Sequence, residues 1–256
     1  MAKHPEADIY RCGHCTHAFS DSASMRKRES YETDYYEDTH RRWFRYPNTR
    51  LFDRLMAVIP HGASVLDVGC GRGDFLRHIH SKRPDVKLTG IDYHPNQDKV
   101  IRFLEGDAFS LDIRDRFDVV FSLAVIEHVQ ECTSFVCRVR ELTKRGGIIV
   151  FMTLNESSIL YGLGRTGRAL GIPLAFNRLY SCHHTHHFTR ESLRRLLESC
   201  SLQVSKHIMH NAPLKAMDIP VRSPAADAVL RAAVWAAFTV GSLTSKTYQQ
   251  TIICSV

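Results

Sequence analysis

The chain has 256 residues, of which 44% are hydrophobic, and a formal net charge of +7. This length and hydrophobic fraction suit one α/β unit with additions. Its eight cysteines form no secretory framework and no signal peptide is recognised, so we expect a cytoplasmic rather than a secreted protein. The positive charge favours an acidic substrate or surface. Because Lys and Arg are spread throughout, the charge alone does not indicate nucleic acid as a partner.

Residues 1–46 are predicted to form an N-terminal extension that is polar and rich in Tyr and His. Within it, Cys12 and Cys15 have the C-x2-C spacing of a zinc knuckle, and His4 or His17 could add a ligand. A zinc site normally needs four ligands, and no second C-x2-C pair occurs, so we expect free cysteines here rather than bound zinc. The aromatic stretch 31–46 is predicted to fold over a substrate pocket.

A helix is predicted over 47–59, and the segment Ser64–Leu76 that follows predicts a strand, a glycine turn and a second helix. The strand is an apolar run over 65–68, and the second helix begins at Asp74. The turn contains three glycines at alternate positions, Gly69, Gly71 and Gly73. Glycines there allow positive φ angles and the close approach of a ligand to the backbone. A cofactor pocket at the carboxyl edge of a parallel sheet is therefore expected.

The spacing of the loop restricts the cofactor. A dinucleotide fingerprint needs a glycine five residues after Gly69, where this chain has Asp74, and no Gly-Lys-Ser/Thr follows for a P-loop. Asp67 lies inside the loop, where it would repel a pyrophosphate. A carboxylate there suits a ligand with a cationic amino group and no phosphate, which describes S-adenosylmethionine.

The loop resembles the first signature of the class I (Rossmann-like) methyltransferases, and later segments extend the resemblance in order. Asp92 ends a second strand over 86–91, Asp107 lies in a turn similar to the family's adenine-binding turn, and 117–123 resembles the fourth strand. The resemblance implies an α/β fold, with a seven-stranded, mostly parallel sheet covered by helices on both faces. Its last strand, over 248–256, is expected to be antiparallel.

By this resemblance, ten residues are expected to bind the cofactor. They are Asp67, Gly69, Cys70, Gly71, Gly73, Asp92, Tyr93, Asp107, Ala108 and Leu123. Ile9–Ser20 also resembles half of the zinc ribbon found in some methyltransferases that act on sugars and natural products. The segment HHFTRESLRRLLES resembles methyltransferases of ubiquinone biosynthesis, with Thr189 as a helix N-cap.

His128, in the turn after the fourth strand, is the candidate general base, or else a helix cap. The pair Glu127-His128 resembles a metal motif of some ubiquinone-type and small-RNA methyltransferases. Ala124 replaces the first glutamate of that motif, so no catalytic metal is expected. The further catalytic candidates are three histidines of one cluster, of which at least one is expected to contact substrate, opposite His128. These are His183, His186 and His187.

The methyltransferase domain is predicted over 47–256, with an insertion at 155–187. Its glycines favour a mobile substrate loop, while its basic and apolar residues leave peripheral membrane contact as the rival interpretation. The apolar part of 225–240 is too short to span a membrane. We expect O-methylation of a small metabolite, sugar or lipid-linked acceptor. An RNA ribose methyltransferase and a non-catalytic S-adenosylmethionine-binding module are the alternatives, and nucleic acid is not the expected partner.

Overall fold

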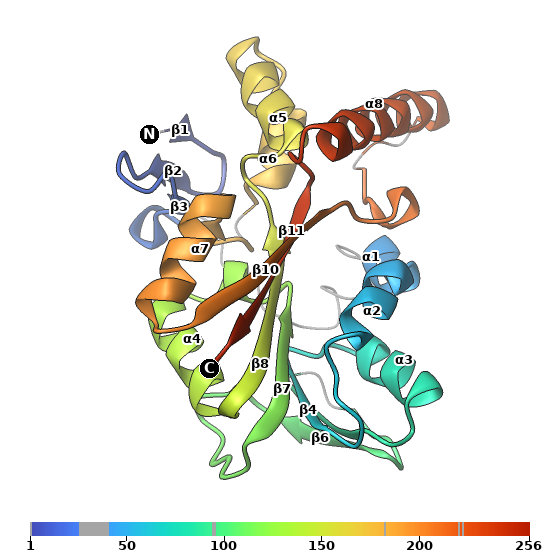
Figure 1. The fold of residues 1–256 in the computed structure, drawn as a ribbon. Helices are drawn as coiled ribbons and strands as arrows, with labels where there is room; N and C mark the ends of the chain where they lie inside the picture. Colours follow the sequence, from blue (N-terminus) through green and yellow to red (C-terminus); the bar gives the residue numbers. More distant parts are fainter. Residues whose placement is uncertain (1, 26–40, 94–95, 182, 220, 222) are drawn as a thin grey trace. The chain divides into compact units, whose positions relative to one another are not determined.

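A computed structural model describes residues 2–25, 41–93, 96–181, 183–219, 221 and 223–256 (Figure 1). The chain divides into two compact units, each described here by itself. Unit 1 comprises Met1–Pro47, Leu154–Leu193 and Ile208–Gln250, and unit 2 comprises Asn48–Thr153, Arg194–His207 and Thr251–Val256. The predicted domain boundary between residues 46 and 47 stays a prediction.

Unit 2 contains the main sheet, whose seven strands lie in the order β10-β11-β8-β7-β4-β5-β6. The strands are β4 (Ser64–Val68), β5 (Lys87–Asp92), β6 (Ile101–Glu105), β7 (Phe117–Leu123), β8 (Thr143–Leu154), β10 (Gln203–His210) and β11 (Gln249–Ser255). The strands from β6 to β8 pair in parallel. Hydrogen bonds from Gly146 N to Val256 O and from Val256 N to Gly147 O make β11 antiparallel to β8. The predicted fold, including its antiparallel last strand, is confirmed.

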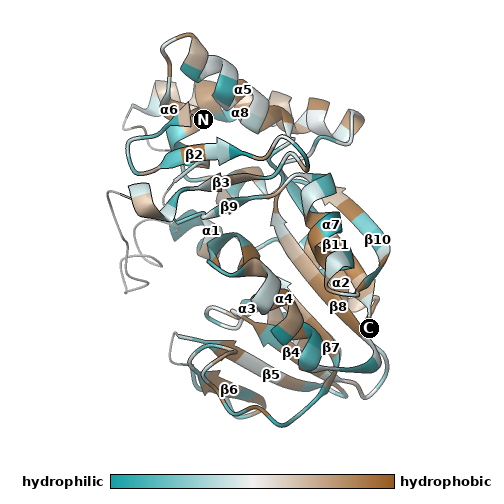
Figure 2. Cartoon of the chain, turned by 90° about the vertical axis from the view of Figure 1, so that its left-hand side faces the viewer, coloured by the Kyte–Doolittle hydropathy of each residue, from teal (hydrophilic) through white to brown (hydrophobic). Residues whose placement is uncertain are grey.

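Helices cover both faces of this sheet, with α3 (Asp74–Lys82) on one face and α4 (Cys132–Glu141) on the other (Figure 1). The core contains side chains of β4, β7 and β8 that are fully buried, among them Leu66, Phe121 and Phe151. The hydrophobic residues along β8 are visible in Figure 2. The predicted helix over 47–59 is α2 (Thr49–Met56), which begins after Asn48 because the Asn48 side chain accepts a hydrogen bond from Leu51 N.

Unit 1 contains a small sheet of the N-terminal strands and one strand from the insertion. Its order is β1 (Ala2–Lys3), β2 (Asp8–Arg11), β3 (Ala18–Ser20) and β9 (His186–His187), all paired antiparallel. Ala18 lies opposite His187, and Phe19 opposite His186. The N-terminal strands are thus held in a sheet. Of the predicted lid, residues 31–40 lie outside the described residues, and 41–45 form the short helix α1 (Arg41–Arg45).

The expectation of a loop at 155–187 is wrong, because most of this segment is helical. It forms α5 (Ile159–Ala169) and α6 (Leu174–Leu179), followed by β9. Gly164 explains the difference. A Cβ there would lie 3.1 Å from Leu179 Cδ1 and 3.4 Å from Phe176 N, so this glycine allows α5 and α6 to pack closely. Here a glycine serves helix packing rather than mobility.

The C-terminal part of the chain contains two further helices. Helix α7 (Arg190–Ser199) begins after Thr189, and the predicted N-cap is confirmed: Ser192 N donates to Thr189 Oγ1 at 3.0 Å and Thr189 N donates to Ser192 Oγ at 2.9 Å. Helix α8 (Pro224–Leu243) has 20 residues, more than the predicted 225–240. Among the described helices it alone is long and apolar enough to cross a membrane by length and composition, and only 17% of its most apolar window is buried. The expectation that this segment is too short to span a membrane is therefore wrong on length and composition, because the helix extends beyond 225–240 at both ends.

Candidate cofactor site

The glycine loop, residues 69–73, connects β4 to α3, and its backbone N–H groups donate hydrogen bonds within the loop or to β5. Gly69, Gly71 and Gly73 have φ angles of 75°, 53° and 79°, in the left-handed region that favours glycine. The N–H groups of Gly69 and Cys70 both donate to Ile91 O, at 2.8 and 3.0 Å, and Gly73 N donates to Cys70 O. These amides are turned into the loop and the neighbouring strand. They do not form the outward-pointing cradle that binds a phosphate.

Neighbouring side chains pack closely against two of the glycines. A Cβ on Gly69 would lie 2.3 Å from Cγ2 of Val125, and one on Gly73 would lie 2.6 Å from Cζ of Phe103. Val125 belongs to the turn after β7, and Phe103 to β6. The glycine loop therefore fits between two segments that the sequence resemblance assigns to the same cofactor site.

Two carboxylates flank the glycine loop. Asp92, which ends β5, accepts a hydrogen bond of 2.7 Å from Gly71 N through its Oδ2. Asp67 is buried in β4, and no group among the described residues donates to its Oδ1. Burial, together with the nearby charge of Asp92, raises the pKa of Asp67 to about 8. A buried carboxyl group without a donor beside a second carboxylate suits a cationic ligand group, so the donor set fits S-adenosylmethionine.

The turn after β6 carries Asp107, whose carboxylate organises its own loop. Asp107 Oδ1 accepts from Phe109 N at 2.7 Å and from Ser110 N at 3.0 Å, and Ser110 Oγ donates to Oδ2 at 2.7 Å. The hydrogen bond from the Ser110 side chain is the main cause that lowers the pKa of Asp107. The Tyr93 side chain also hydrogen-bonds to this carboxylate, so the predicted role of Asp107 toward an adenine amine depends on a carboxylate that already has four donors.

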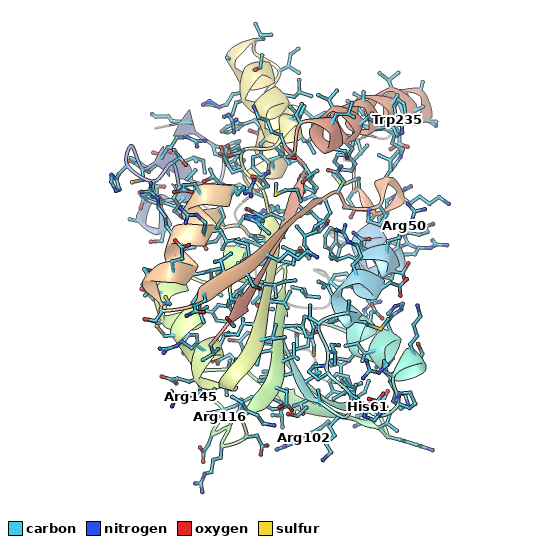
Figure 3. All side chains as sticks on the ribbon, in the orientation of Figure 1. Arg50, His61, Arg102, Arg116, Arg145 and Trp235 are labelled. Atoms are coloured by element: carbon cyan, nitrogen blue, oxygen red, sulfur yellow. The ribbon has the colours of Figure 1, made fainter. Side chains whose placement is uncertain are left out.

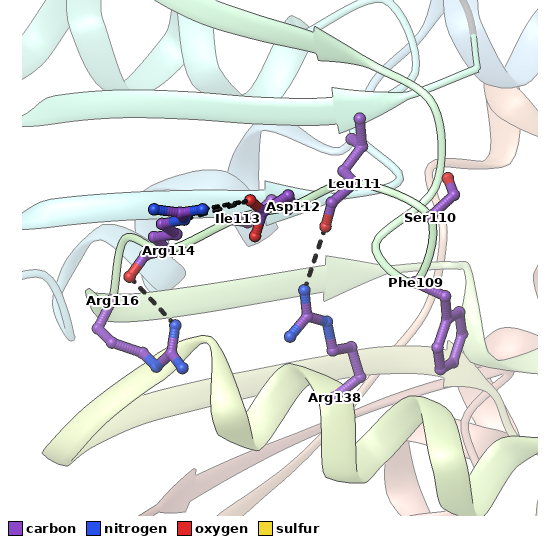
Figure 4. A pocket seen from close by; sticks show the side chains of 8 residues that line it. All are labelled: Phe109, Ser110, Leu111, Asp112, Ile113, Arg114, Arg116 and Arg138. Atoms are coloured by element: carbon purple, nitrogen blue, oxygen red, sulfur yellow. Dashed lines mark hydrogen bonds and ion pairs between the residues drawn. The ribbon is translucent and has the colours of Figure 1, made fainter.

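Arg138 of α4 holds this loop from the other side. Its Nε donates to Ala108 O at 2.8 Å, and its Nη2 donates to Leu111 O at 3.3 Å. A hollow of about 740 Å³ lies beneath the loop (Figure 4), lined by Phe109, Ser110, Leu111, Asp112, Ile113, Arg114, Arg116 and Arg138. The sequence analysis missed Arg138 because its contact with the loop joins residues 30 positions apart.

The turn after β7, residues 124–129, contains a 3₁₀ helix over Ile126–His128. Ala124 has a φ of 60°, which is uncommon for a residue other than glycine and marks a strained backbone. Glu127 is buried, and burial raises its pKa to about 7. His128 is half-buried in the same 3₁₀ helix. A carboxyl group whose pKa is near neutral and an imidazole are thus consecutive in this turn, and the sequence predicted only His128 as a base.

The predicted catalytic histidines 183, 186 and 187 belong to unit 1. His186 and His187 form β9, and His186 Nδ1 lies 2.9 Å from His17 Nε2, so one ring donates a hydrogen bond to the other. Burial is the main cause that lowers the pKa of His17, to about 4, and it also lowers the pKa of His187. His17 and His187 are therefore neutral at physiological pH. The predicted substrate contact of the cluster stays a prediction.

The turn that contains Cys12 and Cys15 joins β2 to β3. Cys12 N donates to His17 O at 2.8 Å, Thr16 N donates to Cys12 O at 3.1 Å, and Thr16 has a positive φ of 62°. Both cysteines are partly exposed. The tight turn explains the C-x2-C spacing as a hairpin connection, and the expected absence of zinc stays a prediction.

Glu156 is a buried centre of unit 1 that the sequence analysis missed. Its Oε1 accepts hydrogen bonds from Arg11 of β2, from Arg165 of α5 at 2.5 Å and from the Tyr180 hydroxyl at 2.5 Å. The sequence does contain a signal, because Glu156 is the only carboxylate between Glu141 and Glu191. This carboxylate therefore joins the N-terminal strands to the insertion.

A parallel sheet with a glycine loop after β4 and acids at the ends of neighbouring strands is the cofactor-binding arrangement of the class I (Rossmann-like) methyltransferase fold. The model of the methyltransferase domain family matches residues 37–207, more than half of the chain. The chain belongs to this family.

Two groups of curated relatives match part of the chain. A ubiquinone biosynthesis O-methyltransferase of Cereibacter sphaeroides is 33% identical over 130 residues, which are 45% of this chain and 52% of the relative. A malonyl-[acyl-carrier protein] O-methyltransferase of Pectobacterium atrosepticum is 30% identical over 135 residues, 46% of this chain and 53% of the relative. The chain thus spans about half the length of these curated relatives.

A solved structure has the same fold over nearly the whole chain. It is the 1,6-didemethyltoxoflavin-N1-methyltransferase of Burkholderia thailandensis, with bound substrate and S-adenosylhomocysteine. It aligns with a TM-score of 0.56 and 13% identity, over 97% of this chain and 98% of that one. At this identity the similarity is one of fold.

Proposed function

We propose that this protein transfers a methyl group from S-adenosylmethionine to an oxygen atom of a small metabolite, sugar or lipid-linked acceptor, in the cytoplasm. The observation that carries the proposal is the pair of carboxylates, Asp67 and Asp92, beside a glycine loop. The N–H groups of Gly69, Cys70, Gly71 and Gly73 in this loop donate hydrogen bonds to other groups of the protein. Such a site attracts a cation and offers no cradle to a phosphate. It therefore favours a sulfonium cofactor over a dinucleotide.

Each acid has a proposed role in holding the cofactor. Asp67 neutralises the cationic amino group, and Asp92 accepts hydrogen bonds from the ribose hydroxyls while its Oδ2 stays fixed by Gly71 N. Asp107 accepts from the adenine amine, in a loop that Arg138 holds in position. When bound, S-adenosylmethionine supplies a methyl group already activated on a positively charged sulfur. The protein's main task is then orientation, and well-oriented reactants can gain up to about 7–11 kcal/mol.

An oxygen acceptor also needs a group that removes its proton. We assign this role to His128, whose half-buried position leaves the imidazole accessible. Glu127 is the second candidate, because its pKa of about 7 matches the pH at which a general base works best. General-base catalysis is worth roughly 10²–10⁴-fold in rate.

The relatives support oxygen as the acceptor atom, since both curated groups are named O-methyltransferases. The acceptors that their names give differ, and this chain spans only about half the length of each relative. We therefore propose the acceptor only as a chemical class.

The direct test incubates purified protein with cell extract and S-adenosylmethionine labelled in its methyl group, followed by identification of the labelled product. A labelled small molecule or lipid supports the proposal, provided that Asp92→Ala reduces the labelling at low cofactor concentration. Label in RNA, with binding that weakens steeply as salt rises, would favour the ribose methyltransferase instead. Cofactor binding without any labelled product would favour a non-catalytic module.

A further inference from the structure

Helix α8 exposes an apolar face along its whole length. Large exposed apolar side chains occur along it at Val229, Trp235, Val240 and Leu243, and the last of these is 82% exposed. The structure describes every residue of Pro224–Leu243. The remaining exposed positions of this helix hold alanines and other small residues, and none of its exposed residues is charged. A helix facing water normally shows charged and polar residues on its exposed side. This face therefore requires a specific explanation.

The opposite face of α8 packs within unit 1. Ala237, Phe238 and Gly241 are buried, and the Phe238 ring stacks on Tyr248 with 5.8 Å between centroids. Asn211 Nδ2 donates to Phe238 O at 3.1 Å. With one side engaged by its own unit, α8 is suited to lie along a surface rather than to cross a membrane alone.

The two charged residues of α8 are also held within unit 1. Asp227 and Arg231 form an ion pair at 2.8 Å, and Arg231 also donates to Leu214 O and Met217 O. From residue 232 to 245 the sequence contains no charged residue. The exposed face of α8 is therefore both apolar and free of charges that would have to be desolvated.

The connection between α5 and α6 is a second exposed apolar segment. Residues 169–175 read ALGIPLA, and every one of them is exposed, including Leu170 at 74%. Gly171 makes the turn with a φ of 81°. Such a run of exposed apolar residues is uncommon unless it has a function. Helix α5 packs against both α6 and α8, and Figures 1 and 2 show this connection and α8 at the same end of unit 1.

Arg168 supplies positive charge beside the α5–α6 connection. Of the other arginines of residues 157–189, Arg165 is bonded to Glu156 and the charge of Arg178 acts on Asp218, and residues 157–189 contain no carboxylate. The guanidinium of Arg168 lies over the Phe176 ring, 4.8 Å from its centroid, next to the exposed segment. Apolar side chains together with arginines are the features that bind an amphipathic surface to anionic lipid headgroups. A second copy of this chain fits less well, because a two-fold contact would bring the same arginines together.

We propose that residues 169–175 and the exposed face of α8, together named the apolar surface, bind the interface of a bilayer that contains anionic lipids. In this arrangement α8 lies in the plane of the interface, and Trp235, which is labelled on α8 in Figure 3, lies among the headgroups. Arg168 contacts the lipid phosphates. This inference concerns unit 1 alone and does not depend on the proposed methyl transfer.

Vesicle flotation tests the proposal. The full chain is mixed with vesicles of phosphatidylcholine alone or of phosphatidylcholine with phosphatidylglycerol. We expect flotation with the anionic vesicles and little with the neutral ones. The double variant Trp235→Ser/Leu243→Ser should bind the anionic vesicles about tenfold more weakly or worse, because it removes two apolar anchors. Arg168→Glu should reduce the preference for anionic lipid. Val100→Ser, which changes an exposed valine of unit 2, is the matched control and should bind like the wild type.

Fluorescence gives the depth of insertion. The chain has two tryptophans, Trp43 and Trp235, so Trp43→Phe leaves Trp235 as the sole reporter. Its emission should shift to the blue on anionic vesicles and be quenched more by bromine near the headgroups than by bromine near the bilayer centre. Circular dichroism verifies that each variant is folded.

Three outcomes would overturn the proposal. One is the absence of vesicle binding by the folded wild type. Another is the strongest quenching at the bilayer centre, with resistance to alkaline extraction, which would indicate a spanning helix. The third is a dimer in solution that the double variant dissociates, which would assign the apolar surface to a second copy of the chain.

Discussion

The backbone N–H of Gly71 donates a hydrogen bond of 2.7 Å to Oδ2 of Asp92, and this bond joins the glycine loop after β4 to the end of β5. One carboxylate thus fixes the loop and also lies where the ribose of the cofactor is proposed to bind. Changes at Asp92 should therefore affect cofactor affinity in two ways, through a lost acceptor and through a loosened loop.

Asp92→Ala should weaken the binding of S-adenosylmethionine by roughly ten- to a hundredfold, since hydrogen bonds to charged groups contribute about 1.5–3 kcal/mol each. Asp92→Asn should lose less, because an amide oxygen can still accept from Gly71 N. Isothermal titration calorimetry measures both affinities. The control is Asp115→Ala, which removes an exposed partner of Arg102. Unchanged affinity in Asp92→Ala would remove Asp92 from the cofactor site.

Asp67 should couple cofactor binding to pH. Its pKa of about 8 keeps Asp67 protonated at neutral pH in the free protein, whereas a cationic amino group beside it favours the ionised form. Binding at pH 7 should therefore release a proton, and affinity should rise as pH increases toward 8. Calorimetry in buffers of different ionisation enthalpy counts the protons. Zero release at pH 7 would contradict the proposed role of Asp67.

The same carboxyl group should lower folding stability at high pH. The pKa of Asp67 is 3.8 in the unfolded chain and about 8 in the folded protein. Between these pH values the folded protein therefore binds one proton more than the unfolded chain. Stability is fully present below pH 3.8 and is progressively lost as pH rises toward 8. Asp67→Asn should remove this loss, making the variant more stable than the wild type at pH 8 but a weaker binder of cofactor. Thermal unfolding at several pH values checks the difference.

The proposed base can be identified by comparing histidine variants. His128→Ala should reduce turnover by roughly 10²–10⁴-fold while leaving cofactor affinity nearly intact. Single alanine variants of His183, His186 and His187 should also lower turnover if at least one contacts substrate. Glu127→Gln is the companion variant, because it distinguishes the contribution of the buried Glu127 carboxyl group to turnover from that of the His128 imidazole. If only His128→Ala is impaired, the histidines of unit 1 serve its small sheet alone.

Glu156 should be essential for the stability of unit 1. Glu156→Gln leaves the half-exposed guanidinium groups of Arg11 and Arg165 without their carboxylate and should cost about 1.5–3 kcal/mol of unfolding free energy. The matched control is Glu198→Gln, which breaks an exposed pair with Arg194 and should cost about 0–1 kcal/mol. Chemical denaturation followed by circular dichroism compares the two. Equal, small losses would show that the buried network contributes little.

The parts of the fold that sequence analysis predicted are those encoded locally. The apolar run 65–68 and the glycine loop after it predict β4, α3 and a cofactor site at the carboxyl edge of the sheet. This is possible because a buried strand and a left-handed turn depend on residues that are neighbours in the sequence. The N-cap at Thr189 is local for the same reason, and the structure confirms it. Asp67 and Asp92 were identified because Asp67 lies near the carboxyl end of one apolar run and Asp92 follows another.

The features that sequence analysis missed depend on contacts between distant residues. Glycines at 162, 164, 167 and 171 predicted a mobile loop, whereas Gly164 allows the close packing of α5 on α6. The raised pKa of Glu127 comes from burial, which a turn sequence does not reveal. Arg138 and Glu156 act through hydrogen bonds to segments far along the chain.

The antiparallel pairing of β3 with β9 has a consequence for synthesis of the protein. His17 and His186, whose rings meet beside this pairing, are 169 positions apart. At roughly 5–20 residues per second, translation would need on the order of ten to thirty seconds between the two histidines. During that interval the β2–β3 hairpin has left the ribosome with an open strand edge and no partner for Arg11. The N-terminal segment should therefore be the part of unit 1 that waits longest for its partner, and the part most dependent on chaperones while the chain is being made.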